Sequence, residues 1–323
     1  MHEGLVGERA LVGQPYLRDP DLRQEYAVEI APRTEVALAK VLREVFGESR
    51  ARSLRVLDLG AGTGAAGAAV RAFFGAGAEV VSIDRVAGSA TIVADVGAPG
   101  PIRGVAGRFE LIVAAHLLNE LFLAMPPAER ASARTERVRA WCETLLAPAG
   151  TVVILEPALR ETSRELLAVR DQLVAGGLHV LAPCLWQGPC PALARERDWC
   201  HDVNYEPPPV IGQRPRRVDF AYLALRTTGE PSQDQSLFRV VSDRLEEKGR
   251  LRLYGCGPAG RHPLVRLDRH HAESNAAFAE AERGDLIRVG DTTIAGDGLR
   301  VGPDSTVIRS PLPSAGEGRP HGP

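Results

Sequence analysis

Short apolar runs alternate with amphipathic stretches over the first two thirds of the chain. Apolar residues recur at helical spacing over 32–46 and 127–146, and further helices are predicted over 65–74 and 160–175. The apolar runs end in glycine, aspartate or proline, which is typical of buried strands. Seven strands are predicted, at 54–59, 79–84, 90–96, 109–118, 151–157, 178–183 and 218–226. Strands that alternate with helices indicate an α/β fold with a parallel, doubly wound sheet.

The pattern changes after residue 183. Residues 183–216 are rich in proline and irregular, and they hold three of the cysteines. Short β-like runs follow at 237–242, 250–256, 262–268 and 285–290. The chain is therefore predicted to contain four parts: a helical segment over 1–50, an α/β domain over 51–235, a small β-rich appendage over 236–309 and a disordered low-complexity tail over 310–323.

Composition narrows the class of protein. The chain has 323 residues, of which 44% are hydrophobic and 25% charged, so it has ample material for a buried core. A formal net charge of −2 excludes a general polycationic nucleic-acid coat but allows a local basic patch. No apolar stretch is long enough for a membrane span, and the N-terminus lacks the pattern of a secretory signal. A cytoplasmic protein with no membrane partner is expected, with a monomer as the favoured state.

A glycine-rich loop follows the first predicted strand. Asp58, Gly60, Gly62 and Gly64 have D-x-G-x-G-x-G spacing. Glycines allow the backbone to turn sharply after a strand and to approach a ligand closely. Amides at the start of the next helix can bind a carboxylate or phosphate, and Asp58 can accept a hydrogen bond from an ammonium group.

Two further acids fit the same pocket. Asp84 ends the second predicted strand, where a carboxylate can bridge two ribose hydroxyls, and Asp95 can accept from an adenine amino group. Together with the loop, these residues indicate an S-adenosylmethionine site. The same loop also matches G-x-G-x-x-G over 62–67, so a dinucleotide site and a tightly packed loop without ligand remain open as alternatives.

The acceptor side of such a site is less defined. The fourth predicted strand ends in the sequence His116-Leu117-Leu118-Asn119-Glu120, and the Asn/Asp-Pro-Pro-aromatic motif expected of an amino-nitrogen methylase is absent there. His116 and Glu120 are candidates for catalysis, but lining of the pocket is favoured. Asn119 and Glu120 are expected to cap the following helix and to hold the loop. The catalytic residues are therefore unknown.

Four cysteines suggest a metal centre. Cys184, Cys190 and Cys200 lie in a proline-interrupted loop, and Cys256 follows in a glycine-flanked strand end. Four soft thiolates suit an iron–sulfur cluster or tetrahedral zinc, with His201 as a possible replacement ligand for zinc. Unliganded buried thiols and a Pro-Cys nucleophile are the other interpretations. Cys142 lies apart in an amphipathic helix and is predicted to be a small buried residue.

Taken together, these residues resemble one family, the mitoribosomal small-subunit assembly factors of methyltransferase-like type and their bacterial relatives. The resemblance covers about 25–290 and is carried by VLDLGAGTG, HLLNEL, ILEPA, the cysteine spacing APC-x5-C-x9-WCHD, RLYGCG and AERGD. The cysteine spacing is the specific part, because the glycine loop is common to all such methyltransferases. Asp202 departs from the pattern, since the family usually has an aromatic residue there.

The resemblance implies a seven-stranded Rossmann-like class I methyltransferase fold whose cysteine-rich insertion, 183–216, lies between the sixth and seventh strands. It implies a [4Fe-4S] cluster on the four cysteines Cys184, Cys190, Cys200 and Cys256. It also implies binding to small-subunit ribosomal RNA in ribosome assembly or translation, with methyl transfer doubtful. An active S-adenosylmethionine-dependent RNA methyltransferase, or a small-molecule methyltransferase with structural zinc, is the alternative.

A local run of positive charge gives modest support for RNA binding. The segment 250–271 contains five arginines and only one acidic residue, and these arginines could neutralise several phosphates. A solvated arginine-rich surface is the competing interpretation. The candidate RNA contacts are Arg250, Arg252, Arg261, Arg266 and Arg269.

Overall fold

A computed structural model describes residues 1, 3–48, 52–207 and 214–310. The chain divides into two compact units. The first contains Met1–Pro183 and Gln187–Glu230, and the second contains Cys184–Trp186 and the chain from Pro231 onward. The predicted tail, apart from Ser310, lies outside the described residues.

A mixed sheet forms the centre of the first unit. Its strands run in the order β3-β2-β1-β4-β5-β8-β6, and only β8 is antiparallel to its neighbours on this path. This order, with an antiparallel strand inserted before the sixth, confirms the predicted Rossmann-like class I methyltransferase fold. The strands are β1 (Leu54–Leu59), β2 (Ala78–Asp84), β3 (Ile92–Val93), β4 (Phe109–Ala115), β5 (Leu146–Pro157), β6 (His179–Ala182) and β8 (Arg216–Arg226).

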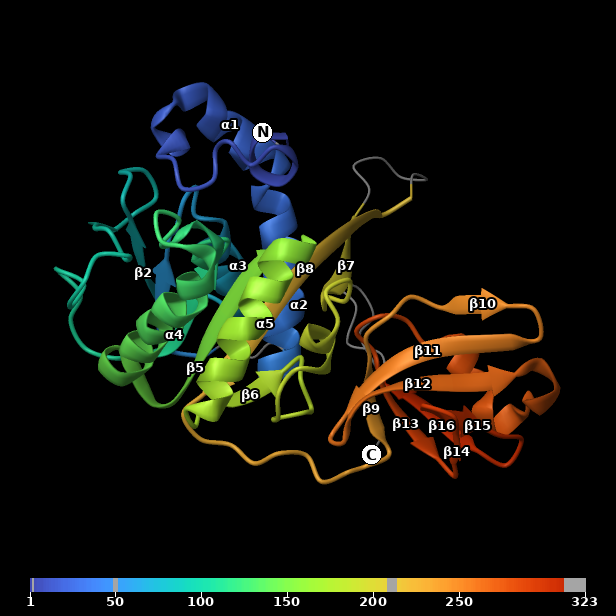
Figure 1. Ribbon diagram of the computed structural model, residues 1–323. Coiled ribbons are helices and arrows are strands. Elements are labelled where there is room, and N and C mark those ends of the chain that lie inside the picture. Colours follow the sequence, from blue (N-terminus) through green and yellow to red (C-terminus); the bar gives the residue numbers. More distant parts are fainter. Residues whose placement is uncertain (2, 49–51, 208–213, 311–323) are drawn as a thin grey trace. The chain divides into compact units, whose positions relative to one another are not determined.

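Helices cover both faces of this sheet (Figure 1). Helices α2 (Ala31–Phe46) and α3 (Ala65–Phe74) lie behind it in the view of Figure 1, and α4 (Pro127–Thr144) and α5 (Arg160–Ala175) lie in front. The central strands are buried on both sides, which explains why they are continuous apolar runs in the sequence. The apolar stripe of α2 packs into the same core as the aromatic end of α3.

The N-terminal segment is built from helical elements. It contains the short helices η1 (Glu3–Gly7) and η2 (Tyr16–Arg18), followed by α1 (Pro20–Glu29). Helix α1 begins after Asp19, whose carboxylate accepts hydrogen bonds from the backbone N–H groups of Asp21 and Leu22, at 2.9 and 3.2 Å.

Two local predictions need correction. The third strand, expected over 90–96, is limited to Ile92–Val93. The segment 183–216, expected to be irregular, contains η4 (Pro191–Ala194) and strand β7 (Asp202–Glu206), which pairs with β8.

A buried ion pair explains the order of β7. Lys40 Nζ lies 2.9 Å from Asp202 Oδ1 and donates a second hydrogen bond to the Val203 carbonyl at 2.6 Å. Both side chains are almost fully buried, so removing either one would leave the other as an uncompensated buried charge. Asp202, which departs from the family pattern, thus ties β7 to α2.

The second unit is a separate β-rich body. Its sheet has the strand order β14-β15-β12-β11-β9-β13-β16, and β10 pairs with β11. Phe238, Leu253, Leu264, Phe278 and Ile287 form its core, together with the helical turn η6 (Glu273–Ala279). The strands are β9 (Leu237–Val240), β10 (Leu245–Glu247), β11 (Arg250–Gly257), β12 (Gly260–Leu267), β13 (Leu286–Gly290), β14 (Thr293–Ala295), β15 (Gly298–Val301) and β16 (Thr306–Ser310).

The short β-like runs of the sequence correspond to β9, β11, β12 and β13, whereas β10 and β14 to β16 were not predicted. None of the helices in the described part of the chain combines the length and hydrophobicity needed to cross a bilayer.

Candidate functional site

The glycine loop connects β1 to the N-terminus of α3. Gly60, Gly62 and Gly64 all have positive φ, at 71°, 53° and 90°. A Cβ on Gly60 would lie 2.9 Å from Leu117 Cδ1, so this position has no room for a side chain without displacing Leu117. Both backbone conformation and close packing therefore require glycine in this turn.

Asp84 holds the loop from the neighbouring strand. One of its carboxylate oxygens accepts a hydrogen bond from the Gly62 N–H at 2.9 Å, and the other accepts from the Val86 N–H at 2.8 Å. Asp58 supports the other end of the turn, because its carboxylate accepts from the Gly67 N–H at 3.2 Å. Asp58 is only 2% exposed and lies beneath the loop.

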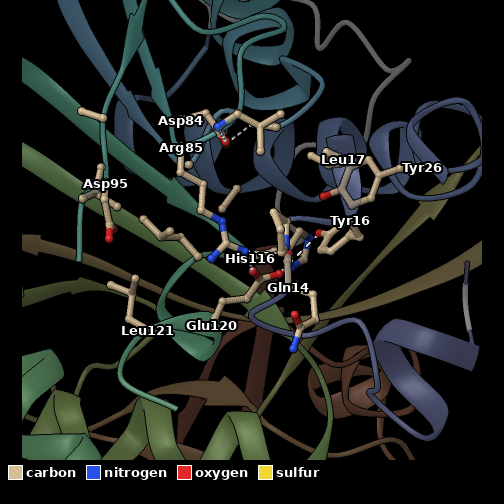
Figure 2. Close-up of a pocket in the computed structure, with 18 residues that line it drawn as sticks. Gln14, Tyr16, Leu17, Tyr26, Asp84, Arg85, Asp95, His116, Glu120 and Leu121 are labelled. Atoms are coloured by element: carbon tan, nitrogen blue, oxygen red, sulfur yellow. Dashed lines mark hydrogen bonds and ion pairs between the residues drawn. The ribbon is translucent and has the colours of Figure 1, made fainter. Parts of the chain in front are cut away.

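A cavity of about 80 Å³ opens at the carboxyl ends of these strands (Figure 2). Of the six residues predicted to bind a cofactor, Gly60, Gly62, Asp84 and Asp95 line it, whereas Asp58 and Gly64 do not. Asp95 also accepts a hydrogen bond from the Gly97 N–H at 2.8 Å. The structure thus brings four of the predicted residues to one cavity, and it makes Asp58 a support of the loop.

The N-terminal segment supplies a wall that the sequence analysis missed. Tyr16 and Tyr26 line the cavity together with Arg85 and Glu120. Tyr16 Oη donates to Glu120 Oε1 at 3.4 Å, and Arg85 Nη2 lies 3.4 Å from Glu120 Oε2. Arg85 also donates to the Gln14 carbonyl at 2.6 Å. The sequence Asp19-Pro20, an N-cap residue followed by proline at the first helical position, is the local signal that could have located the helix in this segment.

A second, larger cavity of about 340 Å³ shares a wall with the first. Tyr16, Tyr26, His116 and Glu120 line both cavities, and Figure 2 shows Tyr16, His116 and Glu120 close together in the middle of the view. The remaining wall comes from η1, α1, α2 and the facing ends of β5 and β8, with Pro157 and Phe220 among its residues.

His116 and Glu120 of the shared wall lie in the loop after β4, and a buried carboxyl group fixes this loop. Glu156 Oε1 accepts from the backbone N–H groups of Leu118 and Asn119, at 2.8 and 3.3 Å. Arg134 donates to the carbonyls of Asn119 and Leu121, at 3.2 and 3.1 Å. A buried acid within an otherwise apolar strand was visible in the sequence run ILEP, and it is the signal that could have identified Glu156.

Asn119 holds this loop as expected, since its side chain donates to the His116 carbonyl at 3.1 Å. The expectation that Asn119 or Glu120 caps the next helix is wrong. Helix α4 starts at Pro127, and its N-cap residue is Pro126, which makes no side-chain cap. Proline at the first helical position leaves one fewer amide to satisfy.

Burial dominates the electrostatics of the site. It raises the pKa of Asp58 and of Glu120 to about 7, although Arg85 acts in the opposite direction on Glu120. It raises the pKa of Glu156 to about 8, against the opposing effect of Arg134. Burial also lowers the pKa of His116 to about 4, so its imidazole is neutral at physiological pH. The loop therefore presents a neutral histidine beside a carboxyl group that titrates near neutrality.

The cysteines are divided between the two units. Cys190 and Cys200 belong to the first, whereas Cys184 and Cys256 belong to the second. All four are half-buried, and the Cys190 N–H donates to the Asp171 carboxylate at 2.9 Å. Among the residues that the structure describes, no group of three or more His, Cys, Asp or Glu side chains could hold a metal ion. The predicted cluster is therefore not supported by the structure.

Cys142 differs from the other four cysteines. It is 5% exposed and lies on the inner side of α4. Burial raises the pKa of its thiol to about 12, which keeps the thiol protonated.

The predicted RNA-contacting arginines have different environments in the second unit. Arg250 forms an ion pair with Glu247, and Arg252 lies 2.5 Å from the same carboxylate. Arg261 lies over the Tyr254 ring at 4.6 Å. Arg266 is only 7% exposed and donates to the Asn275 carbonyl at 2.9 Å, which removes it from the candidate phosphate contacts. Arg269 is exposed.

Sequence comparison matches residues 23–205 to the family described as "Mitochondrial small ribosomal subunit Rsm22". The match covers more than half of the chain and includes the glycine loop and three of the four candidate cluster cysteines, Cys184, Cys190 and Cys200. No curated protein matches the chain.

Comparison with solved structures matches the plantazolicin methyltransferase BpumL in complex with SAH, at 12% identity and a TM-score of 0.40, over 67% of this chain and 94% of that one. A putative RNA methyltransferase from Pyrococcus horikoshii has 13% identity and a TM-score of 0.33, over 59% of this chain and 83% of that one. A murine DNA binding protein bound with double-stranded DNA has 26% identity and a TM-score of 0.18, over 23% of this chain and only 37% of that one.

The buried carboxyl of Glu156 gives the folded protein a testable pH dependence. Its pKa rises from 4.5 to about 8 on folding, so the folded chain retains a proton that the unfolded chain releases between these values. This stabilisation is complete below pH 4.5 and is lost as the pH rises through 8. The wild type should therefore lose at least about 1 kcal/mol of unfolding free energy between pH 5 and 8 relative to Glu156→Gln.

Urea unfolding of both proteins at several pH values measures this difference. Glu136→Gln, which changes an exposed glutamate on α4, is the matched control. Parallel pH profiles for the wild type and Glu156→Gln would show that Glu156 is ionised in the folded protein across this range.

Proposed function

This chain belongs to the Rsm22 family, and from that premise we propose that it is a methyltransferase-fold factor that binds S-adenosylmethionine and small-subunit ribosomal RNA. The observation that carries the proposal is the cavity at the carboxyl edge of the sheet, where the glycine loop and Asp84 meet. In open α/β sheets, ligands bind outside the carboxyl ends of the strands, where the strand order reverses. Because β1 lies between β2 and β4, this cavity occupies that position.

The residues around the cavity suit the cofactor. Gly60 and Gly62 allow the backbone to approach a ligand closely, and a Cβ at Gly60 would collide with Leu117. The Asp84 carboxylate is fixed by two backbone amides and retains acceptor capacity for ribose hydroxyls. Asp95, which also lines the cavity, is the proposed acceptor for an adenine amino group, and Asp58 supports the loop through the Gly67 N–H. S-adenosylmethionine would supply an electrophilic methyl group. The family resemblance implies no established acceptor for this group.

The ribosomal part of the proposal rests on the family and on surface charge. The family is described by its place in the mitochondrial small ribosomal subunit, and the arginines Arg250, Arg252, Arg261 and Arg269 of the second unit are its candidate phosphate contacts. Phosphate contacts position a protein on RNA without reading sequence. We expect recognition by shape and charge, and we expect it to weaken steeply with salt.

We also propose that Cys184, Cys190, Cys200 and Cys256 bind a [4Fe-4S] cluster. Four thiolates are the ligand set of such a cluster, and the family resemblance carries the same spacing. The raised pKa of the Cys142 thiol, which burial brings to about 12, separates Cys142 from this set.

For the cofactor, Asp84→Ala should weaken binding of S-adenosylhomocysteine at least tenfold, because it removes both the ribose acceptor and the support of Gly62. Isothermal titration calorimetry measures this change. Glu79→Ala, which changes an exposed side chain on the same strand, is the control and should leave the affinity unchanged. An unchanged affinity in Asp84→Ala would contradict the assignment.

For the cluster, anaerobically purified protein should contain about four iron and four sulfide per chain and absorb in the visible range. Cys190→Ser should lose this absorbance, whereas Cys142→Ser should keep it at a cost of about 1 kcal/mol for burying a hydroxyl. Colourless protein with stoichiometric zinc, or intact absorbance in Cys190→Ser, would refute the cluster.

For RNA, affinity for a transcript of small-subunit ribosomal RNA should fall linearly with salt on logarithmic axes. Arg269→Gln should reduce the magnitude of this slope by about 1, as expected for the loss of one phosphate contact. Arg288→Gln, which changes another exposed arginine of the second unit, is the matched control. Equal slopes for the wild type and Arg269→Gln would remove Arg269 from the interface.

A further inference from the structure

The second cavity has the size and position of a binding site in its own right. Its volume of about 340 Å³ exceeds the volume of about 80 Å³ of the proposed cofactor cavity. It lies entirely within the first unit and is separated from the cofactor cavity only by the shared wall of Tyr16, Tyr26, His116 and Glu120. A ligand in this cavity would therefore lie next to the cofactor.

The walls of the cavity favour a flat, largely apolar ligand. Tyr16, Tyr26 and Phe220 supply aromatic rings, and the centroids of the two tyrosine rings are 6.1 Å apart. Ile30 and Leu159 add aliphatic surface. Bases that leave a stack are held between aromatic and apolar side chains in this way.

The cavity also has polar groups that can form hydrogen bonds with the edge of a ligand. Within the part of the chain that the structure describes, His116 Nδ1 and Arg33 Nε are buried and have no hydrogen-bond partner. The guanidinium of Arg217 is already paired with the Asp219 carboxylate at 2.9 Å, so it is not a dedicated anion site. Glu120 adds a carboxyl group that can accept from an amino group or, when protonated, donate to a ring nitrogen.

We propose that this second cavity binds one unpaired nucleobase, with its polar edge toward His116 and Glu120 on the wall shared with the cofactor cavity. This inference rests on the proposed function, since it takes the first cavity as the cofactor site. The base belongs either to single-stranded RNA or to a free nucleoside. His116, whose backbone is left-handed with φ of 56°, lines both cavities.

Calorimetric titrations of the full-length protein test this assignment. The probes are the four ribonucleosides and the four homotrinucleotides, each added with and without saturating S-adenosylhomocysteine. Saturation prevents adenosine from reporting on the cofactor cavity. We expect at least one base type to bind to the saturated protein. Tighter binding of the trinucleotide identifies RNA as the source, and equal affinities identify the free nucleoside.

Two cavity-filling variants locate the binding. Leu159→Trp and Val12→Trp fill the second cavity from different elements, and neither residue lines the cofactor cavity. Each should weaken nucleobase binding at least tenfold without changing the affinity for S-adenosylhomocysteine. Val28→Trp, at a position on α1 that is 65% exposed, is the control and should change neither affinity.

The outcomes separate this inference from the proposed function. If no probe binds in either condition, or if both filled variants fold and bind as the wild type does, the second cavity is not a nucleobase site. Binding of S-adenosylhomocysteine in the same experiments would leave the cofactor proposal intact. If nucleobases bind but S-adenosylhomocysteine does not, the cofactor proposal fails and the nucleobase site stands.

Discussion

The site depends on one desolvated carboxyl group, that of Glu156. It lies near the end of a strand in which the preceding residues, 152–155, are fully buried, and it accepts hydrogen bonds from two consecutive backbone amides of the loop after β4. A buried acceptor without these donors would be costly, so the loop is held in one conformation. Arg134 then satisfies the carbonyls of the same loop. Backbone groups that cannot reach water are thus paired from both sides.

This fixed loop determines the geometry of both cavities. His116 and Glu120 face the cofactor cavity on one side and the larger cavity on the other. The glycine turn and Asp84 form the opposite wall of the cofactor cavity. The N-terminal segment closes the site through Tyr16, which donates to Glu120. The result is a pair of adjoining cavities whose shared wall carries little charge, because burial favours the neutral forms of His116 and Glu120.

The two units carry different parts of the proposed function. The first unit holds both cavities and two of the candidate cluster thiols, and the second holds the other two together with the candidate RNA-contacting arginines. The buried pair of Lys40 and Asp202 orders the chain directly after Cys200 within the first unit.

The sequence by itself determined the sheet and the glycine turn. Strands that are buried on both faces must be continuous apolar runs, and a turn with positive φ after β1 requires glycine. Both features can therefore be recognised from neighbouring residues in the sequence. The tertiary structure decided which side chains surround the cavities. Tyr16, Arg85 and Glu156 gain their roles from contacts with residues up to 104 positions away, and no local pattern encodes such contacts. It also removed Arg266 from the basic surface, because a guanidinium can satisfy a buried carbonyl as well as a phosphate.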